Sequence, residues 1–291
     1  MSIRSPDLTG ILNVNKPRGW TSHDVVARVR RLADQKRVGH AGTLDPMAEG
    51  VLPVLLGRAT RLADFIQAGH KTYRAVVCLG TATDTDDAEG EVVSVAEVPP
   101  LSPARVSDVL GAFEGEILQT PPRYSALKVG GRRAYAVARA GGEVDLAPRR
   151  VTIHAIRLLS LAQGELMLEV TCSKGTYVRA LARDIATALG TVGHLGALTR
   201  TRVGPFSLNE SITLEELAER GADALTLPAS RAIPAAPTCS VDPVEIARLA
   251  NGQAVAGDGQ RAEAIWVYDP DGRVVCLASS DGMQLRPRLL L

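Results

Sequence analysis

Apolar and polar side chains alternate over two long stretches of this chain, and a repeat of two residues is typical of β-strands. Residues 71–79 and 166–172 both follow this pattern. Residues 11–14 form a shorter apolar strand pattern, whereas the continuous apolar run at 51–56 fits either a buried strand or a helical turn. These segments predict strands, and the alternating ones predict that one face of each is buried.

Other segments place apolar residues three to four positions apart behind residues that cap helices, as amphipathic helices do. In the first of them, Val25, Val29 and Leu32 share one face. A helix closed by Gly190 follows the sharp connection Ser173-Lys174-Gly175-Thr176. The predicted helix starts follow residues 21–22, 102, 176 and 213.

The amino-acid composition changes at two places along the chain. Residues 119–150 are basic and poor in core residues, which predicts loops with one short helix near 134–140. Residues 227–237 are rich in Ala and Pro and predict a domain boundary. The remaining segment reads as a small β module, with a hairpin formed by 265–268 and 274–277.

Composition narrows the class of protein. The 291 residues suggest about two domains at roughly 150 residues each, and 45% of them are hydrophobic. The net charge of +1 favours no partner, so only local basic clusters, at 28–37 and 123–150, argue for nucleic acid. We expect no secretory signal and no membrane span. The four cysteines are not at metal-binding spacing and predict reduced thiols in a cytoplasmic protein.

Asp45 is the leading candidate for chemistry. It lies in Gly39-His40-Ala41-Gly42-Thr43-Leu44-Asp45-Pro46, where the following proline disfavours helical backbone and the glycines permit positive φ. A carboxylate in such a loop suits catalysis, but Asp and Gly also form ordinary Asx-type turns. Spacing alone favours the turn.

Tyr73 and Arg179 are two further candidates because each lies near the start of a predicted element. A guanidinium would hold a nearby carboxylate ionised and oriented, and a tyrosine could stack on a planar substrate. The alternatives are a core aromatic residue for Tyr73 and a surface arginine for Arg179, with Asp184 as another partner. The sequence alone does not show that Asp45, Tyr73 and Arg179 meet.

Four motifs in order give the chain a resemblance to a known family. The Asp45 loop and the segments Asn15–Ser22, Lys71–Arg74 and Cys172–Arg179 resemble the motifs of the TruB family of tRNA pseudouridine synthases. Residues 122–128 resemble a further family segment, and the likeness spans roughly residues 10 to 205. Four ordered motifs are far more specific than one loop, and they reverse the preference for a simple turn at Asp45.

The resemblance implies isomerisation of uridine 55 in the T arm of tRNA by base flipping, with no cofactor and no metal. Asp45 would be the catalytic carboxylate, and whether it attacks the sugar or the base, or removes a sugar proton, stays open. Arg179 would pair with it and Tyr73 would stack on the flipped base. The implied further substrate-binding residues are Tyr177, Leu198, His40, which would fill the space left by the base, and Lys16, which would contact RNA.

The implied fold is α+β, with a mixed, largely antiparallel sheet flanked by helices and a small C-terminal β-barrel. The catalytic domain would span residues 1–230, with an RNA-contacting insertion at about 119–150. Residues 236–291 would form a PUA-like RNA-binding domain, because Leu249–Gln253 resembles the Leu-x-Asn-Gly-Gln pattern of such modules. Glu49 departs from the small or hydroxyl residue that is usual there.

The expected partner is the T-arm stem-loop of tRNA, and the expected protein is a monomer without membrane association. Two other functions remain as alternatives. One is an RNA-binding protein or folding chaperone without chemistry. The other is a carboxylate hydrolase such as a glycosidase, which generally needs two paired acids; no second acid lies in a comparable loop.

Overall fold

The computed structural model describes residues 8–124, 128–129, 132–133 and 146–291. Its centre is a nine-stranded mixed sheet in which β12 and β3 pair in parallel and the other pairs are antiparallel. This confirms the predicted α+β fold class. The path of the sheet runs through β1 (Gly10–Lys16), β3 (Glu49–Leu56), β12 (Gly193–Val203), β4 (Lys71–Leu79), β11 (Glu165–Cys172), β10 (Arg149–Ala162) and β7 (Gly115–Gln119), with β2 (Val38–His40) on β3 and β13 (Phe206–Ser207) on β12.

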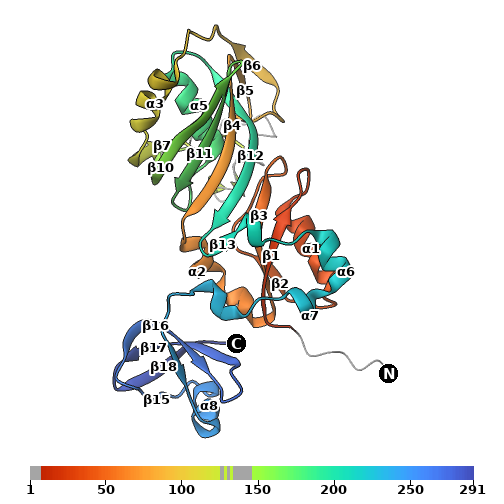
Figure 1. Cartoon of the computed structure of the whole chain (residues 1–291), viewed down its shortest axis with the longest axis vertical. Helices are drawn as coiled ribbons and strands as arrows, with labels where there is room; N and C mark the ends of the chain where they lie inside the picture. Colours follow the sequence, from red (N-terminus) through yellow and green to blue (C-terminus); the bar gives the residue numbers. More distant parts are fainter. Residues whose placement is uncertain (1–7, 125–127, 130–131, 134–145) are drawn as a thin grey trace.

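The long strand β12 joins two halves of this sheet (Figure 1). In Figure 1 the helices α3 and α5 accompany the upper half, and α1, α6 and α7 accompany the lower half. A short sheet of β5 and β6 extends from the upper end. These elements span α1 (Ser22–Leu32), α2 (Ala63–Ala68), α3 (Pro103–Gly111), α5 (Val178–Ala188), α6 (Leu214–Arg220), α7 (Ala222–Leu225), β5 (Thr81–Thr83) and β6 (Val92–Val95).

Local sequence signals place these elements well. Thr21 caps α1 and forms a capping box with Asp24, and Thr213 does the same for α6 with Glu216. Residues 51–56 are a buried strand and not a helical turn. The predicted short helix near 134–140 lies outside the described residues.

The C-terminal segment forms a second, five-stranded sheet beside helix α8 (Pro243–Ala250). The predicted hairpin is confirmed: Gly272 takes a φ of 78°, and the Asp269 N–H donates to the Arg273 carbonyl at 2.9 Å. The sheet order is β14 (Thr238–Ser240), β16 (Arg261–Tyr268), β17 (Val274–Asp281), β18 (Gln284–Leu290) and β15 (Val255–Ala256).

One hydrophobic cluster crosses the predicted domain boundary. Trp266 and Leu277 of the C-terminal sheet belong to the same buried cluster as Leu55 and Phe206 of the large sheet and Ile66 of α2. The two sheets are separate in hydrogen bonding but share packing, so the predicted limits of 1–230 and 236–291 stay a prediction. Among the described residues, no helix is long and apolar enough to cross a membrane.

Candidate active site

Asp45 lies in the loop between β2 and β3, outside any helix. Its side chain is 43% exposed although the loop around it is tied down. The hydroxyl of Ser22 binds both main-chain groups of Leu44, at 2.9 Å to the N–H and 3.2 Å to the carbonyl. The Gly19 N–H donates to the Pro46 carbonyl at 2.8 Å. The carboxylate is therefore presented to solvent from a braced backbone.

Arg179, the second residue of α5, brings its guanidinium to this carboxylate. Its Nε lies 3.1 Å from Asp45 Oδ2, and the arginine side chain is only 8% exposed. The Nε–H is not aligned for a hydrogen bond, so the contact is one of charge. Nη1 donates to the Thr85 carbonyl at 2.9 Å and Nη2 to the Tyr124 carbonyl at 3.0 Å. The geometry fixes the guanidinium from the side away from Asp45.

Asp87 is a partner of Arg179 that the sequence did not indicate. Its Oδ2 lies 3.3 Å from Arg179 Nη1, and its side chain is 6% exposed. The alternative partner Asp184 instead accepts a hydrogen bond from Arg183 at 2.9 Å. Asp87 belongs to the acidic run 84–89, and in the structure this run carries a buried ion pair.

Tyr73 lies on β4, directly opposite Arg200 of β12, and is 7% exposed. Burial raises the pKa of its hydroxyl, and the neighbouring Arg200 guanidinium lowers that pKa in part. Leu198, also on β12 and 8% exposed, pairs across the same ladder with Ala75. The predicted roles of Tyr73 and Leu198 toward a base stay predictions.

Tyr177 and His40 flank the site from two elements. Tyr177 precedes α5, and its main chain is held by Gln119, which accepts from the Tyr177 N–H at 2.8 Å. His40 ends β2 and meets His23 edge to face, with ring centroids 5.7 Å apart. Burial lowers the pKa of His40 and so favours the neutral ring. Whether either residue binds substrate stays a prediction.

Lys16 is buried against the backbone of the Asp45 loop. The side chain is fully buried, and Nζ donates to the carbonyls of Pro17 at 3.0 Å, Trp20 at 2.6 Å and Pro46 at 3.4 Å. Burial lowers the pKa of Lys16 to about 8. The ammonium group thus holds the backbone of the Asp45 loop through the Pro46 carbonyl. A contact between Lys16 and RNA stays a prediction.

Comparison with known proteins decides the family. Residues 30–178 match the family model described as TruB family pseudouridylate synthase, N-terminal domain. The chain belongs to the TruB family. Residues 179–230 match the C-terminal domain model of tRNA pseudouridylate synthase B. As a TruB-family pseudouridine synthase, it is an isomerase.

The similarity between this TruB-family enzyme and its relatives covers nearly the whole chain. It is 45% identical over 287 residues to the tRNA pseudouridine synthase B of Thermobifida fusca, covering 96% of this chain and 97% of the relative. It is 49% identical over 253 residues to that of Symbiobacterium thermophilum, covering 86% and 84%. A solved Cbf5-Nop10-Gar1 complex contains a chain of similar fold, with a TM-score of 0.72, 26% identity and coverage of 97% and 84%.

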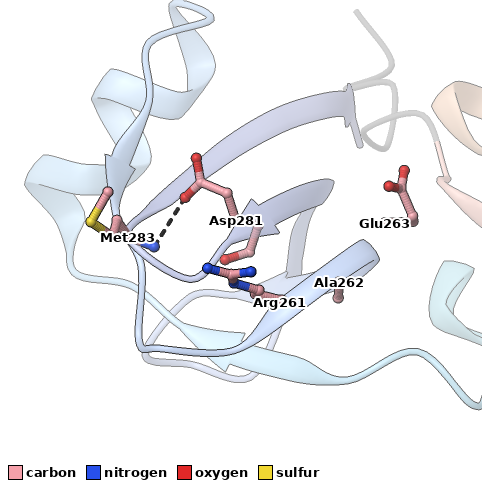
Figure 2. Close-up of a pocket in the computed structure, with 6 residues that line it drawn as sticks. Arg261, Ala262, Glu263, Asp281 and Met283 are labelled. Atoms are coloured by element: carbon pink, nitrogen blue, oxygen red, sulfur yellow. Dashed lines mark hydrogen bonds between the residues drawn. The ribbon is translucent and has the colours of Figure 1, made fainter.

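A large hollow of this TruB-family protein lies in the C-terminal sheet and not at Asp45 (Figure 2). Its volume is about 600 Å³, and Arg261, Glu263, Asp281 and Met283 line it. The Asp281 carboxylate is turned to its own hairpin, where it accepts from the Met283 N–H at 3.0 Å. The lining carries both positive and negative side chains, and none of its residues belongs to the Asp45 loop.

Proposed function

We propose that this enzyme converts uridine 55 in the T arm of tRNA to pseudouridine, with Asp45 as the catalytic carboxylate. The observation that carries the proposal is the contact between the half-exposed Asp45 and the buried Arg179, at 3.1 Å. A carboxylate that faces solvent while its partner is fixed inside the protein is available to a substrate in one orientation. The name tRNA pseudouridine synthase B, which the relatives carry, supports tRNA as the substrate.

The reaction is a rearrangement within one nucleotide. The bond between the sugar and N1 of uracil breaks, the base turns, and the sugar carbon bonds to C5. C5 releases its proton and N1 gains one, so nothing is oxidised and no group is transferred away. A single carboxylate can serve by attack on the sugar, by attack on the base or by removal of a sugar proton. All three routes use the placement of Asp45 described above.

A uridine inside a folded loop must leave its stack before its glycosidic bond is reached, which costs a few kcal/mol. Stacking on an aromatic side chain contributes about 1–3 kcal/mol per base and would offset much of this cost. Tyr73 is suited to that role because β4 carries it beside Arg200, next to the loop of Asp45. We assign His40, at the end of β2, to the space that the base leaves.

Phosphate contacts would fix the register of the RNA. The exposed residues Arg31, Lys36 and Arg37 lie at and beyond the end of α1, where α1 leads into β2 and the Asp45 loop. The C-terminal sheet is consistent with a PUA-like module and would add a second RNA contact. The net charge of +1 is compatible with RNA binding because such charge is gathered locally.

The test is Asp45→Asn, assayed with a T-arm stem-loop tritiated at C5 of uridine 55, because isomerisation releases this hydrogen to water. We expect no tritium release and a dissociation constant for the RNA within threefold of the unmodified enzyme. Glu49→Gln is the matched control, since Glu49 is an exposed carboxylate on the adjoining strand that binds Thr199 at 3.1 Å. Normal tritium release by Asp45→Asn would exclude the catalytic role.

The same assay separates the alternatives. An RNA-binding protein without chemistry would bind the stem-loop and release no tritium in its unmodified form. A glycosidase would release free uracil from the RNA, which chromatography would detect. Either result would replace the isomerase assignment for this substrate.

A further inference from the structure

Arg200 is a fully buried cation held by main-chain carbonyls. Its Nε donates to the carbonyl of Val51 at 2.8 Å, Nη2 to that of Gly42 at 2.9 Å and Nη1 to that of Thr43 at 3.2 Å. Its side chain has no solvent exposure, and no carboxylate of the described residues lies within ion-pair distance. Burying a charge without a counter-ion is costly, so a structural or functional gain must offset it.

Two of the three carbonyls belong to the loop that carries Asp45. Gly42 and Thr43 lie three and two residues before Asp45, and Val51 lies in the strand that follows the loop. A guanidinium presents its donors in a rigid planar fork, whereas the three donors of a lysine ammonium rotate on a flexible stem. The planar guanidinium of Arg200 therefore ties the first part of the Asp45 loop to the strand that follows the loop.

Glycine is required where the backbones of Arg200 and β3 meet. Gly50 pairs with Arg200 across the parallel β3–β12 contact, and a Cβ there would lie 2.3 Å from the Arg200 carbonyl oxygen, too close for any side chain. At Gly42 a Cβ would lie at an ordinary distance of 3.5 Å from Nη1 of Arg200, but the φ of +110° favours glycine.

The same guanidinium reaches the second candidate residue. Tyr73 is directly opposite Arg200 in the β4–β12 ladder, and residues opposite each other in an antiparallel pair share a face. The Arg200 guanidinium also lowers the pKa of the Tyr73 hydroxyl against the effect of burial. One buried residue is thus bonded to the Asp45 loop and paired with Tyr73 across the sheet.

We propose that Arg200 is a positioning residue, which fixes the backbone of the Asp45 loop relative to Tyr73 without touching the RNA. This inference rests on the proposed function, because it assumes that Asp45 acts on a uridine held by Tyr73. It predicts that loss of the guanidinium lowers the rate of the chemical step while RNA binding persists. A 1 Å displacement of a reacting group can cost about 100-fold in rate.

The experiment uses Arg200→Lys and Arg200→Met in the full chain, with Arg202→Met as the matched control. Arg202 lies two positions further along β12 and is exposed. Single-turnover tritium release from the C5-tritiated T-arm stem-loop gives the rate, and equilibrium binding gives the dissociation constant. We expect about a 30- to 100-fold lower rate for both Arg200 variants, dissociation constants within threefold, and a control rate within threefold of the unmodified enzyme.

Three results would overturn the positioning role. A rate within threefold in the folded Arg200→Lys protein would show that the fork is not needed. A dissociation constant that weakens in proportion to the rate would show a contact with RNA. Failure of Arg200→Lys to fold would also contradict the proposal, because Arg200 would then determine the fold itself.

Failure of the underlying function would look different. In that case the unmodified enzyme itself would release no tritium from the stem-loop, whatever the residue at position 200. Tritium release by the unmodified enzyme, combined with no release by Asp45→Asn, establishes the function first. The Arg200 variants are then read against that reference.

Discussion

Replacing Asp87 by asparagine removes one charge from the buried side of Arg179. Asparagine keeps the volume, and its amide oxygen can still accept from the Thr85 hydroxyl at 2.7 Å and from the Glu89 N–H at 3.0 Å, as Asp87 Oδ1 does. The loop backbone therefore stays in place. What is lost is the carboxylate oxygen that lies 3.3 Å from Nη1 of Arg179.

The size of the effect follows from burial. The two side chains are 6% and 8% exposed, so solvent screens their attraction little. A hydrogen bond or contact to a charged group contributes about 1.5–3 kcal/mol, and removing one member of a buried pair costs about 3–5 kcal/mol. Because asparagine retains the neutral contacts, we expect Asp87→Asn to lower the free energy of unfolding by about 2–3 kcal/mol.

Activity should fall more than this stability loss suggests. Without Asp87, only the carbonyls of Thr85 and Tyr124 hold the guanidinium on the side away from Asp45. Arg179 can then follow Asp45 toward solvent, and the carboxylate loses its fixed orientation. We expect a single-turnover rate about 100-fold lower, with unchanged RNA binding because Asp87 is buried.

Asp86→Asn is the control, since Asp86 is the preceding residue and pairs with Arg183 at 2.8 Å rather than with Arg179. Denaturant unfolding and single-turnover tritium release are measured on both variants. Asp86→Asn should retain its rate within threefold. Equal rate losses in the two variants, or a rate within threefold for Asp87→Asn, would refute the role of Asp87 in fixing Arg179.

Two further predictions concern stability. Trp266→Ala should lower the free energy of unfolding by about 3–5 kcal/mol, because Trp266 is 1% exposed within a cluster shared by both sheets. Denaturant unfolding should show one transition at a lower denaturant concentration. A stable large sheet beside an unfolded C-terminal sheet would contradict the shared packing. Burial lowers the pKa of Lys71 from 10.5 to about 8, so the folded state binds fewer protons than the unfolded chain between these values. Lys71 therefore makes stability rise with pH above 8, by at most about 1.4 kcal/mol per pH unit. Lys71→Met should remove this contribution between pH 8 and 9, and an unchanged slope would disprove it.

Much of the fold could be predicted from local patterns. The strand at 71–79 has the predicted limits because strict alternation describes a strand with one buried face. The start of α1 was found because Thr21 and Asp24 form a capping box within one turn. Such signals are short in sequence, and tertiary contacts reinforce them here.

The contacts around Asp45 could not be predicted in the same way. Asp87 is one of several acids in an acidic loop, and a bridge between this loop and Leu195 of β12 brings it inward to Arg179. Arg200 gave rise to no prediction, because its partners are carbonyls, which every residue has. The residues next to Asp87 and Arg200 in the sequence do not predict that these side chains are buried, because their burial depends on segments far apart in the chain.

The charges around Asp45 bear on the proposal that this carboxylate acts on RNA. Lys16, Arg179 and Arg200 are buried within or against its loop, and Asp87 is a buried acid near the half-exposed Asp45. With Asp45 included, three cations face two carboxylates when Lys16 is protonated, a local surplus that the near-neutral chain as a whole does not have. Charges in a poorly screened interior act more strongly than those on the surface. Under the proposed function, this surplus would offset the repulsion between Asp45 and the phosphates of the RNA, with groups that the fold already holds in place.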